Sequence, residues 1–450
     1  MRVLLVSTYE LGHQPLHVAS PAAALRDAGH DVRTLDVSVE PWNPGLVDWA
    51  DAAAFSVPMH TATRLATKGA EAVKRRRPGL PVCFYGLYAG AGRDAADYVI
   101  AGEYESALTG WVDSVAAKTP PPPGGTTLER QRFRTPVRAG LPELDRYAHL
   151  ALGDEQRTAG YTEASHGCAH RCRHCPVPVV YDGRTRKVPI DIVLDDVAQQ
   201  VAAGARHITF GDPDFLNRWS HSMQLVDEFH RRFPDVTYDV TTKVSHVIRH
   251  ADLVPTLAAT GCMFVVSAFE CVNDDVLRLL DKGHTAAEAV EAIHLLRRQG
   301  IEVRPSWLPF MPWTTVADVL DILDFVIAHD LVGNVDPVQY TIKLLIPEGS
   351  LLLALPELAP YLGAYDADNL TYTWRPADGR TVRLQAELTR LVAADQSPAV
   401  FQCIYQTVLD AVGDRRVASA FRCEPKPRLT EPWFCCAEPT DDQFGSLDQM

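Results

Sequence analysis

The sequence lacks the features that would assign it to a membrane or to nucleic acid. No apolar run reaches the roughly 20 residues that a membrane-spanning helix needs. The first six residues have the pattern of a strand and not of a signal peptide. A formal net charge of −14 offers no basic excess for contacts with phosphates. We therefore expect a cytoplasmic protein that has neither a membrane nor a nucleic acid as a partner.

Cysteine is scarce in most of the chain and concentrated in two places. Residues 1–118 hold only Cys83, whereas three of the ten cysteines lie between residues 168 and 175 and three in the last 28 residues. Without a secretory context, such clusters indicate thiols that serve metal binding or catalysis and not a disulfide framework. The scattered remainder we expect to be core thiols: Cys83, Cys262, Cys271 and Cys403.

The cluster in the middle of the chain predicts a metal site with an open position. Cys168, Cys172 and Cys175 are too close in sequence to bridge one another usefully, and soft thiolates are the ligands that iron–sulfur clusters and zinc require. Three ligands leave one metal position open for chemistry. The alternative is a structural zinc, whose fourth ligand would be His166, His170 or His174.

The spacing C-x3-C-x2-C, preceded by Glu163-Ala164-Ser165, resembles the signature of the radical S-adenosylmethionine (SAM) enzymes. The resemblance implies that Cys168, Cys172 and Cys175 hold a 4Fe–4S cluster whose fourth iron is chelated by SAM. It also implies that one electron from the cluster cleaves SAM, usually to methionine and a 5′-deoxyadenosyl radical. A small-molecule substrate and a flavodoxin- or ferredoxin-like electron donor are the partners implied.

Residues 1–118 alternate strands and helices in the pattern of a doubly wound, Rossmann-like domain. Residues 97–105 resemble the V-x-G-E-x-E ending of the cobalamin-binding-like domain that precedes many radical SAM domains. The D-x-H-x-x-G loop that supplies a cobalt ligand is absent, and neither His13 nor His17 has its spacing. We therefore expect this domain to serve packing or substrate access, with cobalamin bound without a protein ligand as the alternative.

The rest of the chain predicts a second α/β unit and a Cys-containing tail. Residues 119–150 form a proline-rich linker and a segment that wraps over the next domain. Six strand–helix repeats in residues 151–350 predict an open (β/α)6 partial barrel, the radical SAM core, whose sixth strand covers residues 338–344. Residues 351–422 should be mostly helical, and residues 423–450 form the tail.

Polar residues at the predicted strand ends are candidate cofactor contacts. By the resemblance, Gly211 and Asp212 stand in for the Gly-Gly-Glu-like segment that meets the SAM amino group, and His174 takes the place of an aromatic near the adenine. The alternatives are an Asp-Pro turn at Asp212 and salt bridges among the charged residues. The other candidates at strand ends are Asp214, Lys243, Ser267, Glu270, Arg304 and Gln339.

The tail holds Cys423, Cys435 and Cys436, which we predict to be catalytic. Adjacent Cα atoms lie about 3.8 Å apart, less than the roughly 4.4–6.8 Å that disulfides prefer, so Cys435 and Cys436 are a strained redox pair or two thiolates offered to one soft atom. The tail resembles that of a radical SAM group in which Cys-Cys-Ala-Glu-Pro alternates with a selenocysteine version. Chance cysteines in a disordered tail are the alternative.

Three functions follow as hypotheses. The first is a radical SAM enzyme whose tail cysteines bind a thiophilic substrate such as trivalent arsenic, forming a carbon–arsenic bond. The second is a cobalamin-dependent radical methyltransferase with the tail as reductant, and the third is a non-catalytic redox or metal sensor. The lone Cys83 argues against a methylthiotransferase, which needs a second three-cysteine cluster.

Overall fold

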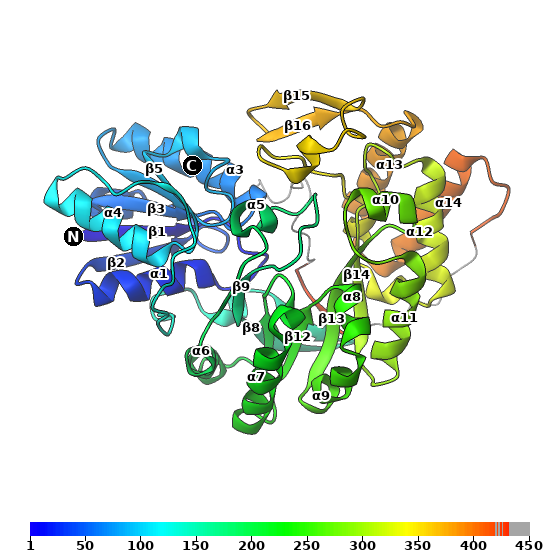
Figure 1. Cartoon of the computed structure of the whole chain (residues 1–450), viewed down its shortest axis with the longest axis horizontal. Coiled ribbons are helices and arrows are strands. Elements are labelled where there is room, and N and C mark those ends of the chain that lie inside the picture. The colour runs from blue at the N-terminus through cyan, green and yellow to red at the C-terminus, as the bar shows by residue number, and fades with distance from the viewer. Residues whose placement is uncertain (419–420, 422–423, 425, 432–450) are drawn as a thin grey trace.

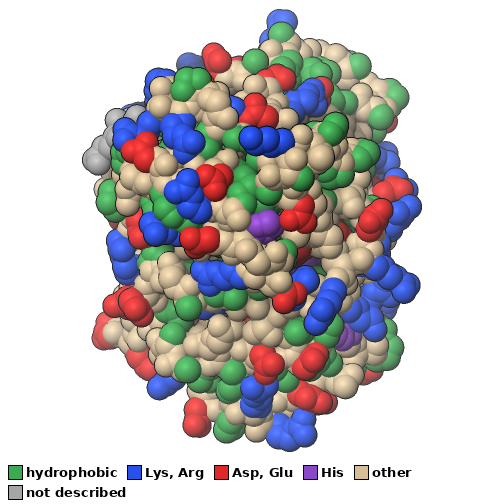
Figure 2. Space-filling model, turned by 90° about the vertical axis from the view of Figure 1, so that its left-hand side faces the viewer, with side chains coloured by type: hydrophobic (Ala, Val, Ile, Leu, Met, Phe, Trp, Pro, Cys, Tyr) green, Lys and Arg blue, Asp and Glu red, His purple; other side chains and the backbone are tan. Residues whose placement is uncertain are grey.

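The computed structural model describes residues 1–418, 421, 424 and 426–431. Figure 1 shows two α/β units side by side, with the C-terminal helices packed on the outer flank of the second unit. Among the described residues, no helix is both long and apolar enough to cross a bilayer. Figure 2 shows acidic and basic side chains interspersed over the described surface on the side of the first unit.

The first unit is a parallel sheet with helices on both faces, as the sequence predicts. The strand order is β2-β1-β3-β4-β5-β6. Successive side chains of β1 point to opposite faces of the sheet. Leu4 and Val6 therefore pack in one buried cluster, and Val3 and Leu5 pack in another on the opposite face. Its elements are β1 (Arg2–Ser7), α1 (Leu16–Asp27), β2 (Asp31–Asp36), α2 (Pro44–Trp49), β3 (Ala52–Ser56), α3 (His60–Arg76), β4 (Val82–Tyr85), β5 (Tyr98–Gly102), α4 (Glu105–Ala117) and β6 (Gly125–Thr127).

The second unit is a partial barrel, also as predicted. Its sheet has the order β14-β13-β12-β11-β8-β7-β17, with β8 to β14 parallel and the last two strands antiparallel. The strands are β7 (His149–Leu152), β8 (Glu155–Thr162), β11 (His207–Phe210), β12 (Thr237–Thr241), β13 (Cys262–Glu270), β14 (Glu302–Trp307) and β17 (Arg428–Leu429). The helices are α5 (Val177–Tyr181), α6 (Ile190–Ala202), α7 (Trp219–Arg232), α8 (Val244–Arg249), α9 (Val254–Ala259), α10 (Asp274–Leu279), α11 (Ala286–Arg297) and α12 (Val316–Ala328).

The sixth barrel strand predicted at residues 338–344 is wrong in its secondary structure. The segment begins as a 3₁₀ helix, η6 (Pro337–Thr341), and an isolated bridge joins Lys343 to Phe310. Pro337 has no N–H to offer to a ladder. The side-chain oxygen of Gln339 accepts a hydrogen bond of 3.0 Å from the backbone N–H of Trp307 instead. A side chain thus makes the contact to β14 that a strand backbone would otherwise make.

The C-terminal region adds a hairpin that the sequence does not predict. β15 (Leu362–Asp366) and β16 (Thr371–Trp374) pair antiparallel ahead of the expected helices α13 (Arg380–Ala394) and α14 (Phe401–Val412). The chain then returns to the barrel as β17, which extends the sheet beside β7.

Residues 119–150 contact both α/β units through one buried arginine. The guanidinium of Arg138 donates two hydrogen bonds of 2.8 Å to Asp196 on α6. It also donates to the backbone carbonyls of Gln14, at 3.2 Å, and Tyr161, at 2.7 Å. This segment therefore holds the loop after β1, strand β8 and helix α6 together.

Candidate functional site

A cavity of about 310 Å³ lies where the carboxyl ends of the two parallel sheets face each other. The first unit contributes Gly86 and Gly102, which follow or end β4 and β5. The barrel contributes Cys168, Cys172 and Cys175. The structure thus brings the three predicted cluster ligands together on one wall of an interdomain cavity, where α/β folds usually bind ligands.

The cysteine loop is set by a tight turn at its start. β9 (Ser165–Gly167) pairs with β10 (Thr185–Lys187), and Gly167 has a φ of 75°. A Cβ at Gly167 would lie 2.3 Å from the carbonyl oxygen of Arg184, so only glycine fits directly before Cys168.

Two side chains already contact the cluster thiols. The amide nitrogen of Asn217 lies 3.4 Å from Cys168 Sγ, and Lys243 Nζ lies 3.3 Å from Cys172 Sγ. Burial raises the pKa of Cys168 to about 11. A nearby ammonium favours the thiolate that a metal requires, so Lys243, which the sequence predicts as a cofactor contact, lies against a predicted cluster ligand.

The three histidines that could complete a zinc site are paired with carboxylates. His166 Nδ1 lies 3.1 Å from Glu103, His170 Nε2 lies 3.4 Å from Asp214, and His174 Nε2 lies 3.0 Å from Glu270. Each of the three histidines therefore has a carboxylate next to one of its ring nitrogens.

Glu270 holds a buried charge cluster beside the cysteine loop. It ends β13 with a φ of 65° and accepts hydrogen bonds from Lys282 Nζ, at 2.9 Å, and His174. Burial opposes its charge, but the cations of Lys282 and His174 outweigh burial and hold the pKa of Glu270 well below its ordinary value. The sequence predicts that Glu270 must be paired, but it does not identify Lys282 as the partner. In the structure, Lys282 lies in a turn between Asp281 and Gly283, both of which have a positive φ.

Gly211 and Asp212 line the cavity and support the strand that leads to Cys168. Asp212 accepts hydrogen bonds from the N–H of Ala164, at 2.9 Å, and the hydroxyl of Ser165, at 2.5 Å, and burial raises its pKa to about 7. A Cβ at Gly211 would lie 2.0 Å from the hydroxyl of Tyr161.

Three other candidates lie outside the lining of the cavity in the described part of the chain: Asp214, Ser267 and Arg304. Asp214 faces two histidines described below. Arg304 pairs with Asp336 at 2.8 Å and donates to the carbonyl of Pro427, so its charge is already matched away from the cavity. This placement favours the salt-bridge alternative for Arg304 over a contact with the SAM carboxylate. Gln339 does line the cavity.

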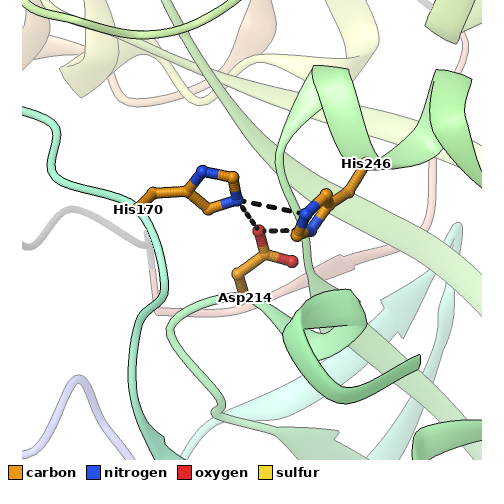
Figure 3. Close-up of side chains that lie close together, drawn as sticks. All are labelled: His170, Asp214 and His246. Carbon is orange, nitrogen blue, oxygen red and sulfur yellow. Dashed lines mark hydrogen bonds and ion pairs between the residues drawn. The ribbon is translucent and has the colours of Figure 1, made fainter. Parts of the chain in front are cut away.

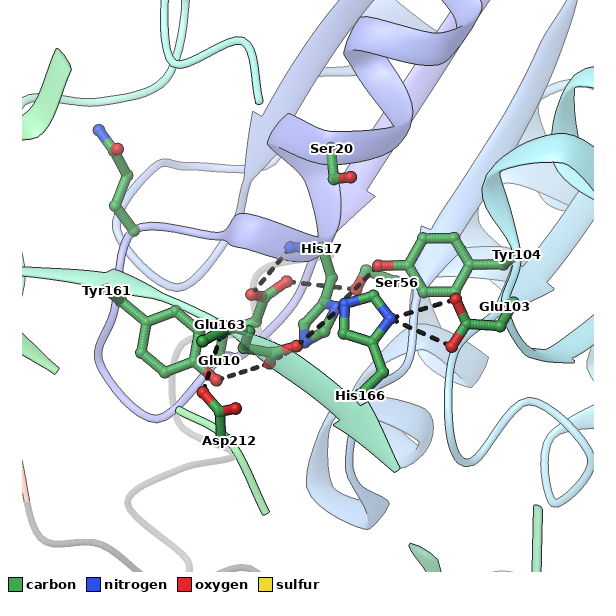
Figure 4. A network of polar contacts seen from close by, with 12 residues as sticks. Glu10, His17, Ser20, Ser56, Glu103, Tyr104, Tyr161, Glu163, His166 and Asp212 are labelled. Carbon is green, nitrogen blue, oxygen red and sulfur yellow. Dashed lines mark hydrogen bonds and ion pairs between the residues drawn. The ribbon is translucent and has the colours of Figure 1, made fainter. Parts of the chain in front are cut away.

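A buried polar network crosses between the two units beside the cavity (Figure 4). His17 Nε2 lies 3.3 Å from Glu163, and its Nδ1 lies 2.8 Å from the hydroxyl of Tyr104. Burial lowers the pKa of His17, but Glu163 and Glu10 outweigh burial and raise it to about 9. Burial raises the pKa of Glu10 to about 7. The sequence analysis missed this network, although Glu163 lies in the motif that precedes Cys168.

His13 has a different environment from His17. It is buried on the cavity wall and stacks on Tyr161, with ring centroids 4.6 Å apart. Burial lowers its pKa to about 4, which keeps the imidazole neutral at physiological pH.

Comparison with known families agrees with this architecture. Residues 162–326 match the Radical SAM superfamily, and residues 2–112 match the B12 binding domain. The chain joins a B12 binding domain to a radical SAM domain. The second match favours our alternative, in which the first unit binds cobalamin, over a domain that serves only packing or substrate access. The radical SAM domain confirms the expected class of enzyme and implies a 4Fe–4S cluster and SAM.

The matched proteins are distant. A curated relative is ribosomal protein uS12 methylthiotransferase RimO of Porphyromonas gingivalis, 24% identical over 226 residues, which are 44% of this chain and 52% of that protein. Bacteriochlorophyllide d C-12(1)-methyltransferase of Chlorobaculum tepidum is 26% identical over 133 residues, 29% of this chain and 28% of that one. The chain thus spans about half or less of the length of these relatives.

Two solved structures share the fold. The radical SAM methyltransferase TsrM from Kitasatospora setae, with tryptophan and a SAM analog bound, has a TM-score of 0.59 at 20% identity, covering 73% of this chain and 71% of that one. The cobalamin-dependent radical enzyme OxsB, with aqua-cobalamin and SAM bound, has a TM-score of 0.68 at 14% identity, covering 90% of this chain and 68% of that one.

Two expectations stay predictions. The tail cysteines Cys423, Cys435 and Cys436 lie outside the described residues. Some relatives are named for tRNA modification, so the absence of a nucleic-acid partner also stays a prediction.

Proposed function

We propose that this chain is a cobalamin-dependent radical SAM transferase that transfers a methyl group to a small molecule. The observation that carries the proposal is the shared cavity, in which the cysteine loop of the barrel faces the strand ends of the B12 binding domain. Two cofactors that must cooperate on one substrate need to meet in one place, and this cavity is where both domains open.

The residues of the barrel fit the cluster. Three thiols with one open position suit an iron–sulfur cluster that leaves an iron for SAM. Lys243 contacts Cys172. Burial lowers the pKa of Lys282, but Glu270, with contributions from Cys172 and Cys175, outweighs burial and raises it. Two cations beside the thiols would offset part of the charge of three thiolates.

The wall from the first unit suits a large ring with polar substituents. Its lining combines the apolar Leu11, Pro58, Met59, Leu87 and Tyr88 with the polar Glu10, His13 and His17. When bound, the cluster and SAM supply one-electron cleavage of SAM, and cobalamin supplies methyl transfer. Of the chain's own residues, the apolar side chains of this wall exclude water. The Glu270 cluster on the barrel side of the cavity holds buried charge.

The test is anaerobic reconstitution with iron, sulfide and cobalamin, followed by analysis of the products of SAM. We expect a cobalamin absorption spectrum that stays with the protein and 5′-deoxyadenosine that disappears when Cys168, Cys172 and Cys175 are replaced by alanine. A non-catalytic sensor would give a cluster but no 5′-deoxyadenosine. Protein without retained cobalamin would refute the cobalamin-dependent function.

A second candidate function concerns a thiophilic substrate held by the tail. β17 brings Leu429 to the cavity wall, and Glu431 accepts a hydrogen bond of 2.5 Å from the hydroxyl of Tyr9. Cys435 follows this anchor by four residues in the sequence. This anchoring supports a role for Cys435 and Cys436 at the cavity, either as ligands of trivalent arsenic during carbon–arsenic bond formation or as a reductant.

Arsenite separates the two roles of the tail. Stimulation of SAM cleavage by arsenite that is lost in Cys435→Ala and Cys436→Ala supports the thiophilic substrate. The matched control is Cys403→Ala, because Cys403, which we expected from the sequence to be a core thiol, is exposed on α14. If arsenite does not change the rate of SAM cleavage, the thiophilic-substrate candidate is refuted. The proposal of a methyl transferase is not affected by that result.

A further inference from the structure

A second cluster of metal-binding side chains lies behind the cysteine loop (Figure 3). His170 belongs to the loop itself, between Cys168 and Cys172. Asp214 follows β11, and His246 lies on α8. Asp214 and His246 are buried, whereas His170 is partly exposed and lines the cavity. Three elements far apart in sequence therefore bring two imidazoles and one carboxylate together.

The distances between these side chains fit a metal ion. One ring nitrogen of each histidine and one oxygen of Asp214 all lie within 4.8 Å of one another. His170 Nε2 lies 3.4 Å and His246 Nδ1 lies 2.9 Å from Asp214 Oδ2, and the other ring nitrogen of His246, Nε2, lies 3.2 Å from His170 Nε2. Ligand atoms about 2.0–2.1 Å from a tetrahedral ion lie roughly 3.3–3.4 Å from one another. Small rotations of the two rings would bring one nitrogen of each imidazole and the carboxylate oxygen to such separations around one ion.

The carboxylate is oriented as a metal ligand usually is. Asp214 Oδ1 accepts hydrogen bonds from the N–H of Leu216, at 3.1 Å, and the hydroxyl of Thr242, at 2.9 Å. These two bonds hold one oxygen and turn the other, Oδ2, toward the imidazoles (Figure 3). Hydrogen bonds to the far oxygen are the outer contacts that fix a coordinating carboxylate in metal sites.

We propose that His170, Asp214 and His246 bind one divalent transition-metal ion, separate from the iron–sulfur cluster. Two imidazoles and a carboxylate suit Zn²⁺ or Fe²⁺ and leave a further position for water or a ligand from the cavity. Through His170, the ion ties the loop that carries Cys168 and Cys172 to α8 and to the end of β11. The proposal does not depend on cobalamin or on the reaction.

The test uses Co²⁺ as a spectroscopic probe on the full-length chain. The background is a variant in which the three loop cysteines, the three tail cysteines and the exposed Cys403 are alanine, so that only the buried Cys83, Cys262 and Cys271 remain. We expect one Co²⁺ per chain with the visible absorption of nitrogen and oxygen ligands. His246→Ala and Asp214→Asn in this background should weaken binding at least tenfold. His250→Ala is the matched control, because its ring packs against His246, with centroids 5.7 Å apart, outside the ligand set.

Thermal unfolding with and without Co²⁺ guards against misfolded variants. We expect the ion to raise the midpoint for the background and for His250→Ala but not for His246→Ala. If His246→Ala does not fold, His246→Gln replaces it. No Co²⁺ binding in the background, or equal binding by all variants, overturns the proposal and leaves a hydrogen-bonded His–Asp–His group.

Discussion

At the scale of single residues, the charge cluster around Glu270 makes the most direct prediction. Glu270→Gln keeps the shape of the side chain but leaves the buried ammonium of Lys282 without a counter-charge. Removing one partner of a buried ion pair costs about 3–5 kcal/mol. We therefore expect the free energy of unfolding, measured in urea, to fall by about that amount.

The matched control removes both charges. Glu270→Gln combined with Lys282→Met should recover a substantial part of the lost stability, because no unpaired charge then remains buried. A single variant as stable as the unmodified chain would show that Lys282 can reach solvent or another acid, and it would contradict the cluster described here.

The sequence could predict some of these residues but not their partners. Glu270 follows an apolar strand, so its burial and its need for a partner could be inferred from β13 alone. Lys282 comes from a loop after α10, and only the folded chain places it beside Glu270. Arg304, which the sequence predicts at a strand end, lies inside β14, and Asp336 from another segment neutralises it. The strand end at Glu270 can thus be predicted from sequence, whereas pairing across elements cannot.

At the scale of elements, the segment that wraps between the two units depends on Arg138. Arg138→Met would leave Asp196 buried and unpaired and would remove two bonds to backbone carbonyls. We expect a loss of about 3–5 kcal/mol in the free energy of unfolding. The control is Arg157→Met, since the Arg157–Glu155 pair lies at the surface and should cost at most about 1 kcal/mol. Equal effects of the two variants would argue against this account of the wrap.

The elements also show where periodicity is informative. Apolar runs predict the central strands, such as β1 and β3 of the first sheet and β11 of the second, because these strands are buried on both faces. Residues 338–344 have the same composition, but Pro337 and the side-chain contact of Gln339 give a 3₁₀ helix instead. β17 cannot be predicted from the sequence, because two residues are too few to show an alternating pattern. Its pairing with β7 also joins residues about 280 positions apart in the sequence.

At the scale of the whole molecule, the interdomain network predicts a dependence on pH. The pKa of His17 is raised to about 9 in the folded chain, against roughly 6.5 when unfolded. Its contribution to stability is therefore fully present below pH 6.5 and is lost as pH rises through 9. Between pH 8 and pH 10, above the titration of Glu10, the unmodified chain should lose roughly 1 kcal/mol more than His17→Gln. Parallel pH profiles for the two proteins would contradict a charged His17 at this boundary.

The central claim is that one cavity between the two domains serves an iron–sulfur cluster and cobalamin together. The most direct measurement is the amount of acid-labile sulfide and cobalt that stays with the chain after anaerobic reconstitution and gel filtration. The account predicts four sulfides and one cobalt per chain, with the sulfide lost when Cys168, Cys172 and Cys175 are replaced by alanine. A chain that retains zinc without sulfide, or sulfide without cobalt, would contradict it.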